Sequence, residues 1–421
     1  MANTYIANLV FGRCSAVITH IFSEKTLYCE YNYYLCNKIV SYYMKDIIQV
    51  NPFVVGRYVS DRYFCDRKDE TAQLLKHIWN GRNVALISPR RMGKTGLIHH
   101  CFGQDRLASY HTFFVDIYAT TSLAELVYLL GKAIYDELKP RSSKWVDRFF
   151  RTVGSLRMGF KFDPVTGDPV LDISLGDIQA PQTTLDEIFR YLETADRPCV
   201  VAIDEFQQIG NYVENNVEAM LRTRIQQCHN TFFIFAGSRR HLMSNMFNSA
   251  AKPFYQSAVT MGLGPIPSGV YADFASKMFE DHGRRIQDGV AQTVHERFDG
   301  CTWFVQMIMN ELFALTPHGG VCGKDMVDTA IRNVIIAQEG TYKELLTHIA
   351  PKQKQVLQAI AREGMARSIT SGAFVKKYKL TSASSVQAAV KSLLKTELVT
   401  QDGDAYRVYD HFLAYWLAHE Y

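Results

Sequence analysis

The 421-residue chain lacks long hydrophobic runs, paired cysteines and a strong charge of either sign. No apolar run approaches the roughly 18–20 residues that a membrane-spanning helix needs. The N-terminus also lacks the basic start and the small-residue cleavage site of a secretory signal peptide. The nine cysteines include no C-x-x-C pair and no metal-ligand spacing, so no zinc site is indicated and a reducing compartment fits best. We therefore expect a cytoplasmic protein that has no membrane partner.

The charged residues are nearly balanced, with a formal net charge of +4. Residues 351–421 contain seven lysines and three arginines against three glutamates and three aspartates, so this segment carries the whole excess. The composition, 47% hydrophobic and 21% charged, is that of a globular protein. At about 150 residues per domain, the length indicates two or three domains. Any electrostatic attraction to nucleic acid must come from the last segment.

The most informative stretch is residues 84–95, which read Val-Ala-Leu-Ile-Ser-Pro-Arg-Arg-Met-Gly-Lys-Thr. An apolar run with β character ends in a tight turn, and a helical pattern then opens at Gly93. This is the strand–loop–helix order of a phosphate-binding loop. The backbone N–H groups of such a loop and the positive end of its helix hold a phosphate chain. The usual pattern begins with glycine where this chain has Ser88, so the loop entry must manage without a residue that takes positive φ easily.

This loop predicts a nucleotide site in which single residues have distinct roles. Lys94 would reach the β- and γ-phosphates, and the Thr95 hydroxyl would bind Mg²⁺. Arg90 and Arg91 have two interpretations, contact with nucleotide or pairing with an acidic residue elsewhere, and we favour the pairing. The candidate phosphate-binding residues are Ser88, Pro89, Arg90, Arg91, Met92, Gly93, Lys94, Thr95 and Gly96.

A second apolar run, residues 199–205, ends in two carboxylates, Asp204 and Glu205. A fully apolar run suits a strand that is buried on both faces of a parallel sheet. Acidic residues at its carboxyl end lie where α/β sheets bind ligands. Asp204 would hold Mg²⁺, and Glu205 would orient or deprotonate the attacking water. Taken alone, the run favours a buried strand before a solvated acidic turn; beside the phosphate loop, we favour the catalytic interpretation.

A third run, residues 231–236, is followed by Gly-Ser-Arg-Arg-His. Ser238 would contact the γ-phosphate or the attacking water, and a simple turn serine is an equal alternative. Arg239 or Arg240 could clamp a phosphate, against the alternative of a solvated basic turn, and we take Arg240 as the candidate. Asp116, at another strand end, is a weaker candidate, one that would contact the ligands of Mg²⁺ and not the ion itself.

Strands alternate with helical patterns up to about residue 263, which predicts an α/β domain with a mostly parallel sheet. We predict a nucleotide-binding core over residues 44–265, a helical lid over 266–346 and a C-terminal module over 347–421. Within the core, residues 157–176 alternate in polarity around a turn signal, which predicts an inserted hairpin whose role is unknown.

Residues 1–43 are rich in tyrosine and follow no helical or strand period. Two interpretations stay open. In the first, Met44 is the true start and the preceding residues are upstream sequence. In the second, these residues are a genuine short extension that packs on the core.

The C-terminal module has the order of a winged helix-turn-helix: three helices over residues 351–364, 371–378 and 381–395, then a hairpin over 398–408. The third helix has an apolar face and a polar face with Ser384, Gln387, Lys391 and Lys395. In DNA-binding versions this helix enters the major groove and the wing touches the backbone. The alternative is a module that contacts protein or packs on the lid, because the exposed face has no Arg and no Asn to read bases. The candidate phosphate contacts to DNA are Lys376, Lys377, Lys379, Lys391, Lys395 and Arg407.

From about residue 51 onward the chain resembles the archaeal-type ATPases of the STAND/AAA+ branch of P-loop NTPases. The resemblance is carried by five stretches: Phe64-Cys-Asp-Arg-Lys-Asp-Glu70, Pro89-Arg-Arg-Met-Gly-Lys-Thr95, Val200-Val-Ala-Ile-Asp-Glu205, Phe235-Ala-Gly-Ser-Arg-Arg240 and Tyr409-Asp-His-Phe-Leu-Ala-Tyr-Trp-Leu417. It implies an ASCE sheet with strand order 5-1-4-3-2, a helical lid and a winged helix. It also implies that Lys94 and Thr95 bind phosphate and Mg²⁺, that Asp204 and Glu205 are the acidic pair, and that Ser238 is the polar sensor.

The function implied is a Mg²⁺-dependent ATPase whose hydrolysis is coupled to a switch of lid and winged helix. The catalytic residues would be Glu205, Lys94 and Ser238. Lids of this family often carry Gly-His-Pro before an aromatic residue, whereas this chain has Gly300-Cys-Thr-Trp303, which leaves adenine recognition by the lid in question. The alternative function is a nucleotide-sensing, DNA-binding regulator that does not hydrolyse ATP. Partners would be ATP and either duplex DNA or a protein; the oligomeric state is not indicated.

Overall fold

The computed structural model describes residues 51–138, 143–155, 159–162, 169–172 and 178–419. The predicted extension, residues 1–43, lies outside the described residues, so both interpretations of it stay open. The described residues from Phe53 onward form one compact unit.

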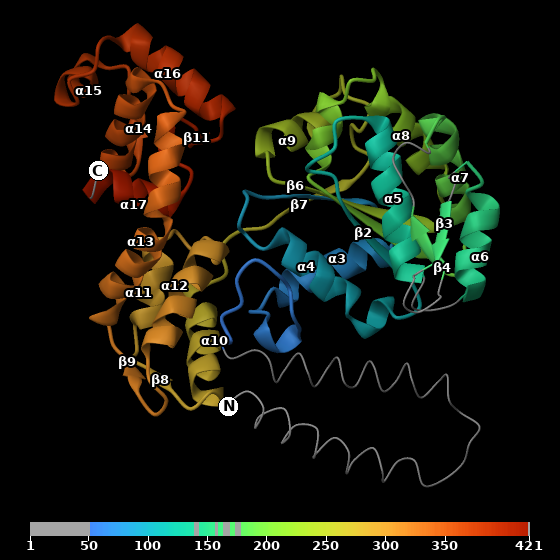
Figure 1. The fold of residues 1–421 in the computed structure, drawn as a ribbon, viewed down its shortest axis with the longest axis horizontal. Helices are drawn as coiled ribbons and strands as arrows, with labels where there is room; N and C mark the ends of the chain where they lie inside the picture. The colour runs from blue at the N-terminus through green and yellow to red at the C-terminus, as the bar shows by residue number, and fades with distance from the viewer. Residues whose placement is uncertain (1–50, 139–142, 156–158, 163–168, 173–177, 420–421) are drawn as a thin grey trace. The chain divides into compact units, whose positions relative to one another are not determined.

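A five-stranded parallel sheet lies at the centre of the first half (Figure 1). Its order is β2 (His111–Asp116), β5 (Cys199–Asp204), β6 (Thr231–Gly237), β1 (Val84–Ile87) and β7 (Val259–Gly262). With the five strands numbered along the chain and the sheet read from β7, this is the predicted order 5-1-4-3-2. The phosphate-loop strand therefore lies between β6 and β7, and the strand with the acidic end lies between β2 and β6.

Both faces of this sheet are covered, which is why β1 and β5 are buried along their whole length. On β5, for example, Val201 and Ile203 face one cluster of buried side chains, and Val200 and Ala202 face the other. One face packs on α5 (Leu123–Leu138), α6 (Ser143–Thr152), α7 (Pro181–Glu193), α8 (Val217–Gln227) and α9 (Arg240–Asn248). The opposite face packs on α3 (Lys68–Trp79) and α4 (Lys94–Phe102). Short 3-10 turns cover Asp61–Tyr63, Asp105–Leu107 and Phe206–Asn211.

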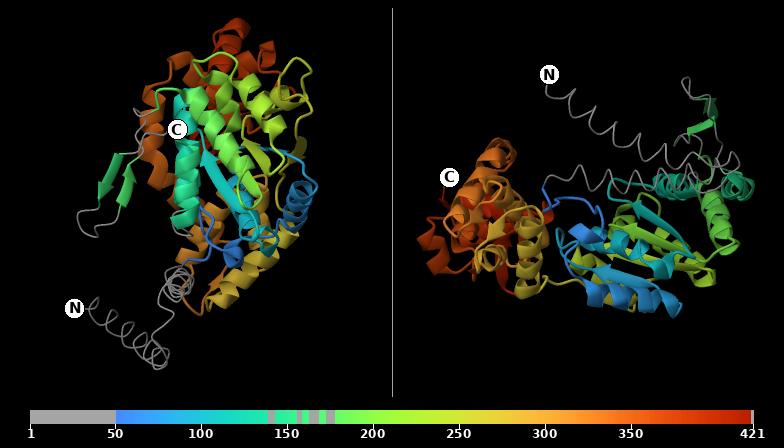
Figure 2. Two further views of the ribbon diagram at one scale, coloured as in Figure 1. Left: turned by 90° about the vertical axis from the view of Figure 1, so that its right-hand side faces the viewer. Right: turned by 90° about the horizontal axis from the view of Figure 1, so that it is seen from below.

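The inserted hairpin consists of β3 (Gly159–Phe162) and β4 (Pro169–Asp172), which pair antiparallel as predicted. It projects away from the central sheet (Figure 2). The predicted turn between these strands lies outside the described residues.

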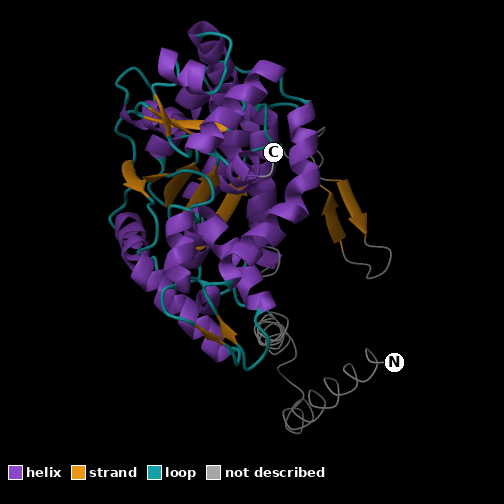
Figure 3. Ribbon diagram, turned by 90° about the vertical axis from the view of Figure 1, so that its left-hand side faces the viewer, coloured by secondary structure: helices purple, strands orange, loops and turns teal. Residues whose placement is uncertain are grey.

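The second half of the chain is largely helical (Figure 3). The lid contains α10 (Ser268–Asp281), α11 (Val290–Arg297), α12 (Thr302–Leu315) and α13 (Met326–Thr347), with a two-stranded pairing of β8 (Arg285–Ile286) and β9 (Val321–Cys322). None of the helices in the described part of the chain is long and apolar enough to cross a membrane.

The C-terminal module has the predicted helix–helix–helix–hairpin order. It contains α14 (Pro351–Glu363), β10 (Ala366–Arg367), α15 (Gly372–Lys377), α16 (Ala383–Lys395), β11 (Val399–Asp402), β12 (Ala405–Val408) and α17 (His411–His419). Ser371 and Ser382 cap α15 and α16, each accepting a hydrogen bond from the backbone three residues on. One continuous buried cluster joins this module to the lid, with Trp416 of α17 against Tyr342 of α13 at a ring separation of 5.6 Å. The predicted divisions at 265/266 and 346/347 remain predictions.

Candidate functional site

The loop of residues 88–93 joins the end of β1 to the start of α4. Two of its residues have positive φ, Arg91 (67°) and Gly93 (93°), and the loop can turn there into the first N–H groups of α4. Ser88 does not have positive φ, and its N–H donates to the carbonyl oxygen of Gly237 at 3.3 Å. Position 88 therefore does not require a glycine, because the left-handed backbone conformations of this loop occur at Arg91 and Gly93.

Lys94 lies under this loop, with only 6% of its surface exposed. Its ammonium donates to the carbonyl oxygens of Ser88 and Pro89, both at 3.0 Å. Burial lowers the pKa of Lys94, and the charges of Asp204 and Glu205 partly oppose this shift. A buried ammonium that is held mainly by neutral carbonyls would gain from an anion placed against the loop.

Thr95 and Asp204 meet where the first turn of α4 approaches the end of β5. The Thr95 hydroxyl donates to a carboxylate oxygen of Asp204 at 2.7 Å, and Asp204 is 6% exposed. Asp116 pairs in register with Asp204 on the neighbouring strand, and its pKa is raised, first by burial and also by the charges of Asp204 and Glu205. The predicted strand-end carboxylates are therefore adjacent.

The oxygen donors of this corner fit Mg²⁺. Thr95 and Asp204 offer a hydroxyl and a carboxylate, which are hard ligands of the kind that Mg²⁺ takes. No group of three or more His, Cys, Asp or Glu able to hold a metal occurs in the described part of the chain. Mg²⁺ usually keeps several waters and phosphate oxygens in its shell, so one hydroxyl and one carboxylate are enough protein ligands for it.

Glu205 is held by a short chain of hydrogen bonds. Ser238, at the end of β6, donates its hydroxyl to Glu205 at 2.7 Å, and Gln207 donates its amide to the same oxygen at 2.5 Å. The guanidinium of Arg90 donates to the Ser238 hydroxyl at 3.3 Å. Glu205 itself has positive φ (55°), which is uncommon for a residue with a side chain. The predicted base, the predicted sensor serine and one loop arginine are thus in contact.

Comparison with known proteins agrees with this geometry. Residues 340–419 match the family model described as "Probable winged helix domain". The solved structure of a Walker-type ATPase of Pyrococcus abyssi is 17% identical to the chain, covers 87% of it and 99% of its own length, and has a TM-score of 0.61. The ORC2 protein of Aeropyrum pernix, solved in ADPNP and ADP complexes, is 13% identical, covers 88% of this chain and 96% of its own, and has a TM-score of 0.53.

The chain has the fold of the P-loop ATPases. Its C-terminal segment is a winged helix domain. A search of curated proteins gave no match. The resemblance stated from the sequence is confirmed at the level of fold.

Arg91 of the P-loop is surrounded by residues of the lid and the winged helix. Its guanidinium pairs with Asp410 at 2.8 Å and lies 4.2 Å from the ring centre of Trp303 and 4.7 Å from that of Phe304. The backbone carbonyl of Arg91 accepts from the N–H of Trp303 at 3.0 Å. Sequence reasoning named Trp303 only for the departure from the family's lid motif and did not connect it, Phe304 or Asp410 with Arg91, although Asp410 lies within one of the stretches that carried the resemblance.

Arg90 and Arg239 share one partner, Glu397, which follows α16. Arg90 contacts one carboxylate oxygen at 2.5 Å, and Arg239 contacts the other. Arg90 and Arg91 thus have the carboxylate partners that the sequence argument favoured. Arg239, rather than the named candidate Arg240, is brought to Arg90; Arg240 begins α9 and is exposed.

His411, at the start of α17, follows Asp410 and packs against Phe304 of the lid. Its ring lies 4.7 Å from Phe304, and burial lowers its pKa against the opposing effect of Asp299 and Asp410. In the unfolded chain a histidine takes a proton near pH 6.5, before His411 does in the native state. The unfolded state therefore binds more protons, and the free energy of unfolding falls as pH drops below about 6.5.

We expect His411→Phe to reduce this loss of stability on acidification. The measurement is the urea midpoint at pH 7.5 and at pH 5.5. The control is the same substitution at His229, whose side chain is 86% exposed. Burial also lowers the pKa of His77 and His99, so a residual slope is expected. An unchanged difference between the two midpoints in His411→Phe would contradict the assignment.

Proposed function

We propose that this protein is a cytoplasmic, Mg²⁺-dependent ATPase of the STAND/AAA+ type. The observation that carries the proposal is the contact of Thr95 with Asp204 beside Lys94, with Glu205 held by Ser238 at the next position. These residues come from three separate elements: the loop and first turn of α4, the end of β5 and the end of β6. Few functions other than nucleotide binding need this set of residues at one sheet edge.

Each residue has a role in an in-line attack of water on the γ-phosphate. Lys94 places a positive charge at the β- and γ-oxygens, where negative charge develops. Thr95 and Asp204 would hold Mg²⁺, which neutralises phosphate charge when bound. Glu205 accepts a proton from the attacking water or orients it, and Ser238 and Gln207 fix the carboxylate in place. Backbone N–H groups at 91–95 would bind the phosphate chain.

The proposal also includes a conformational switch that involves the lid and the winged helix. Arg91 joins the P-loop to Trp303 in the lid and to Asp410 in the winged helix. A change in the P-loop on binding or hydrolysis would alter contacts with both modules at once. This supports the proposal that hydrolysis is coupled to movement of lid and winged helix.

The test is steady-state phosphate release by the full chain with ATP and Mg²⁺, beside the same reaction with a chelator. We expect turnover that needs Mg²⁺. If ATP binds without turnover, the sensor function below gains support. If ATP does not bind, the proposal is wrong.

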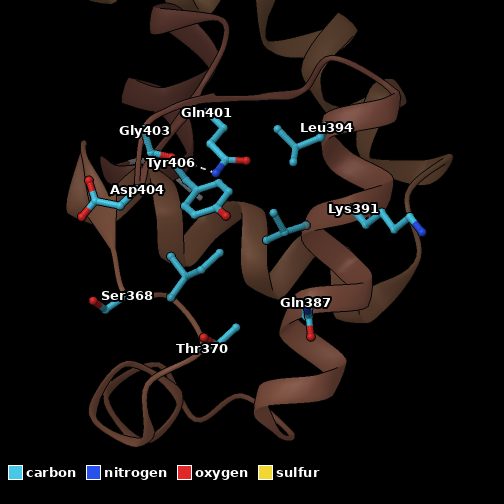
Figure 4. Close-up of a pocket in the computed structure, with 11 residues that line it drawn as sticks. Ser368, Thr370, Gln387, Lys391, Leu394, Gln401, Gly403, Asp404 and Tyr406 are labelled. Atoms are coloured by element: carbon cyan, nitrogen blue, oxygen red, sulfur yellow. Dashed lines mark hydrogen bonds between the residues drawn. The ribbon is translucent and has the colours of Figure 1, made fainter. Parts of the chain in front are cut away.

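The second candidate is a nucleotide sensor that binds duplex DNA. The observation in its favour is the exposed face of α16, which presents Gln387, Lys391 and Lys395. A groove of about 680 Å³ opens between this helix and the wing (Figure 4). Against it, two nearby arginines are already paired: Arg367 of β10 with Asp404 at 2.6 Å, and Arg407 of the wing with Asp299 at 2.7 Å.

For this second candidate, we expect the double variant Lys391→Glu/Lys395→Glu to weaken duplex binding by roughly tenfold or more and to lower its salt dependence, since each phosphate contact releases counterions. Fluorescence anisotropy with a labelled duplex at several salt concentrations measures both. Lys352→Glu/Lys354→Glu on α14 is the control with the same change in charge. Equal loss in both double variants would indicate non-specific attraction and not docking by α16.

A further inference from the structure

Two guanidinium groups converge on one carboxylate between the ATPase core and the winged helix. Arg90 comes from the P-loop, Arg239 from the turn after β6, and Glu397 from the turn between α16 and β11. Each carboxylate oxygen of Glu397 contacts one arginine. The three side chains are between 27% and 35% exposed, so water and salt partly screen the attraction between the arginines and Glu397.

The backbone conformation of Glu397 helps to fix the position of its carboxylate. Its φ is 58°, in the left-handed region that residues with a side chain rarely adopt. Its N–H donates to the carbonyl oxygen of Leu394 at 3.2 Å, which ends α16 at this point. The turn therefore delivers a single carboxylate to two arginines of another module.

The arginine pair lies beside the proposed reaction centre. Arg90 donates to Ser238, and Ser238 donates to Glu205. Glu397 is thus connected to the proposed base through two intervening side chains. Two arginines that meet at one carboxylate, with Arg90 one hydrogen bond from Ser238, form a positively charged group close to the proposed base, and guanidinium groups bind phosphoryl oxygens as well as carboxylates.

We infer that Arg90 and Arg239 form an anion site for the γ-phosphoryl group of ATP, and that Glu397 competes with that group for the site. The inference rests on the proposed function, because it takes the P-loop as an ATP site. A carboxylate and a phosphoryl oxygen both accept charge-assisted hydrogen bonds from guanidinium, so one can replace the other. ADP lacks the third phosphate and cannot take this position.

The competition gives the winged helix a way to distinguish ATP from ADP. ATP must displace Glu397 to use both arginines, and displacement frees the turn between α16 and β11. ADP leaves the contact of Glu397 with Arg90 and Arg239 intact. The expected signature is a change in the ratio of ATP affinity to ADP affinity, not a change common to both.

The experiment measures ATP and ADP affinities of the full chain by calorimetry with Mg²⁺, in wild type and in Glu397→Gln. We expect ATP to bind roughly three- to tenfold more tightly to the variant, because the competing charge is gone, and ADP to bind within about twofold of wild type. The control is Glu363→Gln, which removes another winged-helix carboxylate. Glu363 pairs with Lys377 at 2.6 Å inside the same module and should change neither affinity.

A second variant tests the arginine side of the site. Arg239→Gln should weaken ATP binding roughly three- to tenfold and leave ADP binding near wild type. If Glu397→Gln strengthens ATP and ADP equally, Glu397 acts only by holding the winged helix, and the competition is wrong. An unchanged ATP-to-ADP ratio in both variants also overturns it. Wild-type protein that binds neither nucleotide refutes the proposed function itself, an outcome separate from the other two.

Discussion

Replacement of Lys94 by alanine is expected to abolish ATP binding, with a loss of at least about 100-fold in affinity, or about 3 kcal/mol. Lys94 is buried and donates to two carbonyl oxygens of its own loop. In the proposed complex its ammonium would exchange these neutral partners for phosphate oxygens. Alanine removes the charge at the point where the phosphate charge is densest.

The measurement is calorimetric titration of ATP into the wild type and the variant, with circular dichroism to verify that both are folded. Lys352→Ala, an exposed lysine of α14, is the matched control and should bind as wild type does. Lys94→Ala with near wild-type ATP affinity would place the phosphates elsewhere and remove the basis of the proposed function.

Glu205→Gln is expected to lower turnover by about 100- to 1000-fold while ATP affinity stays within a few-fold of wild type. The substitution keeps the shape of the side chain and its contact with Ser238, but an amide cannot accept a proton from water. Because Glu205 lies beyond the loop that would hold the phosphates, binding should survive. A loss confined to kcat is the pattern of a group that acts on the attacking water.

Single-turnover and steady-state phosphate release measure this effect, with Glu344→Gln on the exposed side of α13 as control. Turnover at the wild-type rate in Glu205→Gln would require another base. If the wild type itself binds ATP and does not turn over, the nucleotide-sensor function moves ahead, and a missing activator becomes the next question.

The fold could be predicted from the sequence wherever local pattern and burial agree. The apolar runs of β1 and β5 are each four to six residues long and are buried on both faces, so composition alone separates them from the amphipathic helices around them. The winged helix was likewise predicted from helical periodicity and a Gly-containing turn, and a family model covers the same residues. The strand order came from the resemblance and not from any pattern within the strands.

The site could be predicted in part. Thr95 and Asp204 lie 109 positions apart, yet both follow from one rule, that a phosphate loop and an acidic strand end share the carboxyl edge of a sheet. The functional roles of these residues stay predictions. The arginines were harder: the sequence argument offered Arg239 or Arg240 and took Arg240, whereas the structure brings Arg239 and Arg90 to one carboxylate, Glu397. The phosphate-binding role of Arg240 stays a prediction.

By itself, the sequence determined the elements, their order along the chain and the residues that stand at strand ends, since these depend on local periodicity and on backbone preferences. Only the tertiary structure decided the partners of the arginines. Arg91 and Asp410 are 319 positions apart, and no local pattern links a P-loop to the turn before the last helix. An arginine side chain is long enough to reach several carboxylates, so its partner is chosen by how the lid and the winged helix pack against the core.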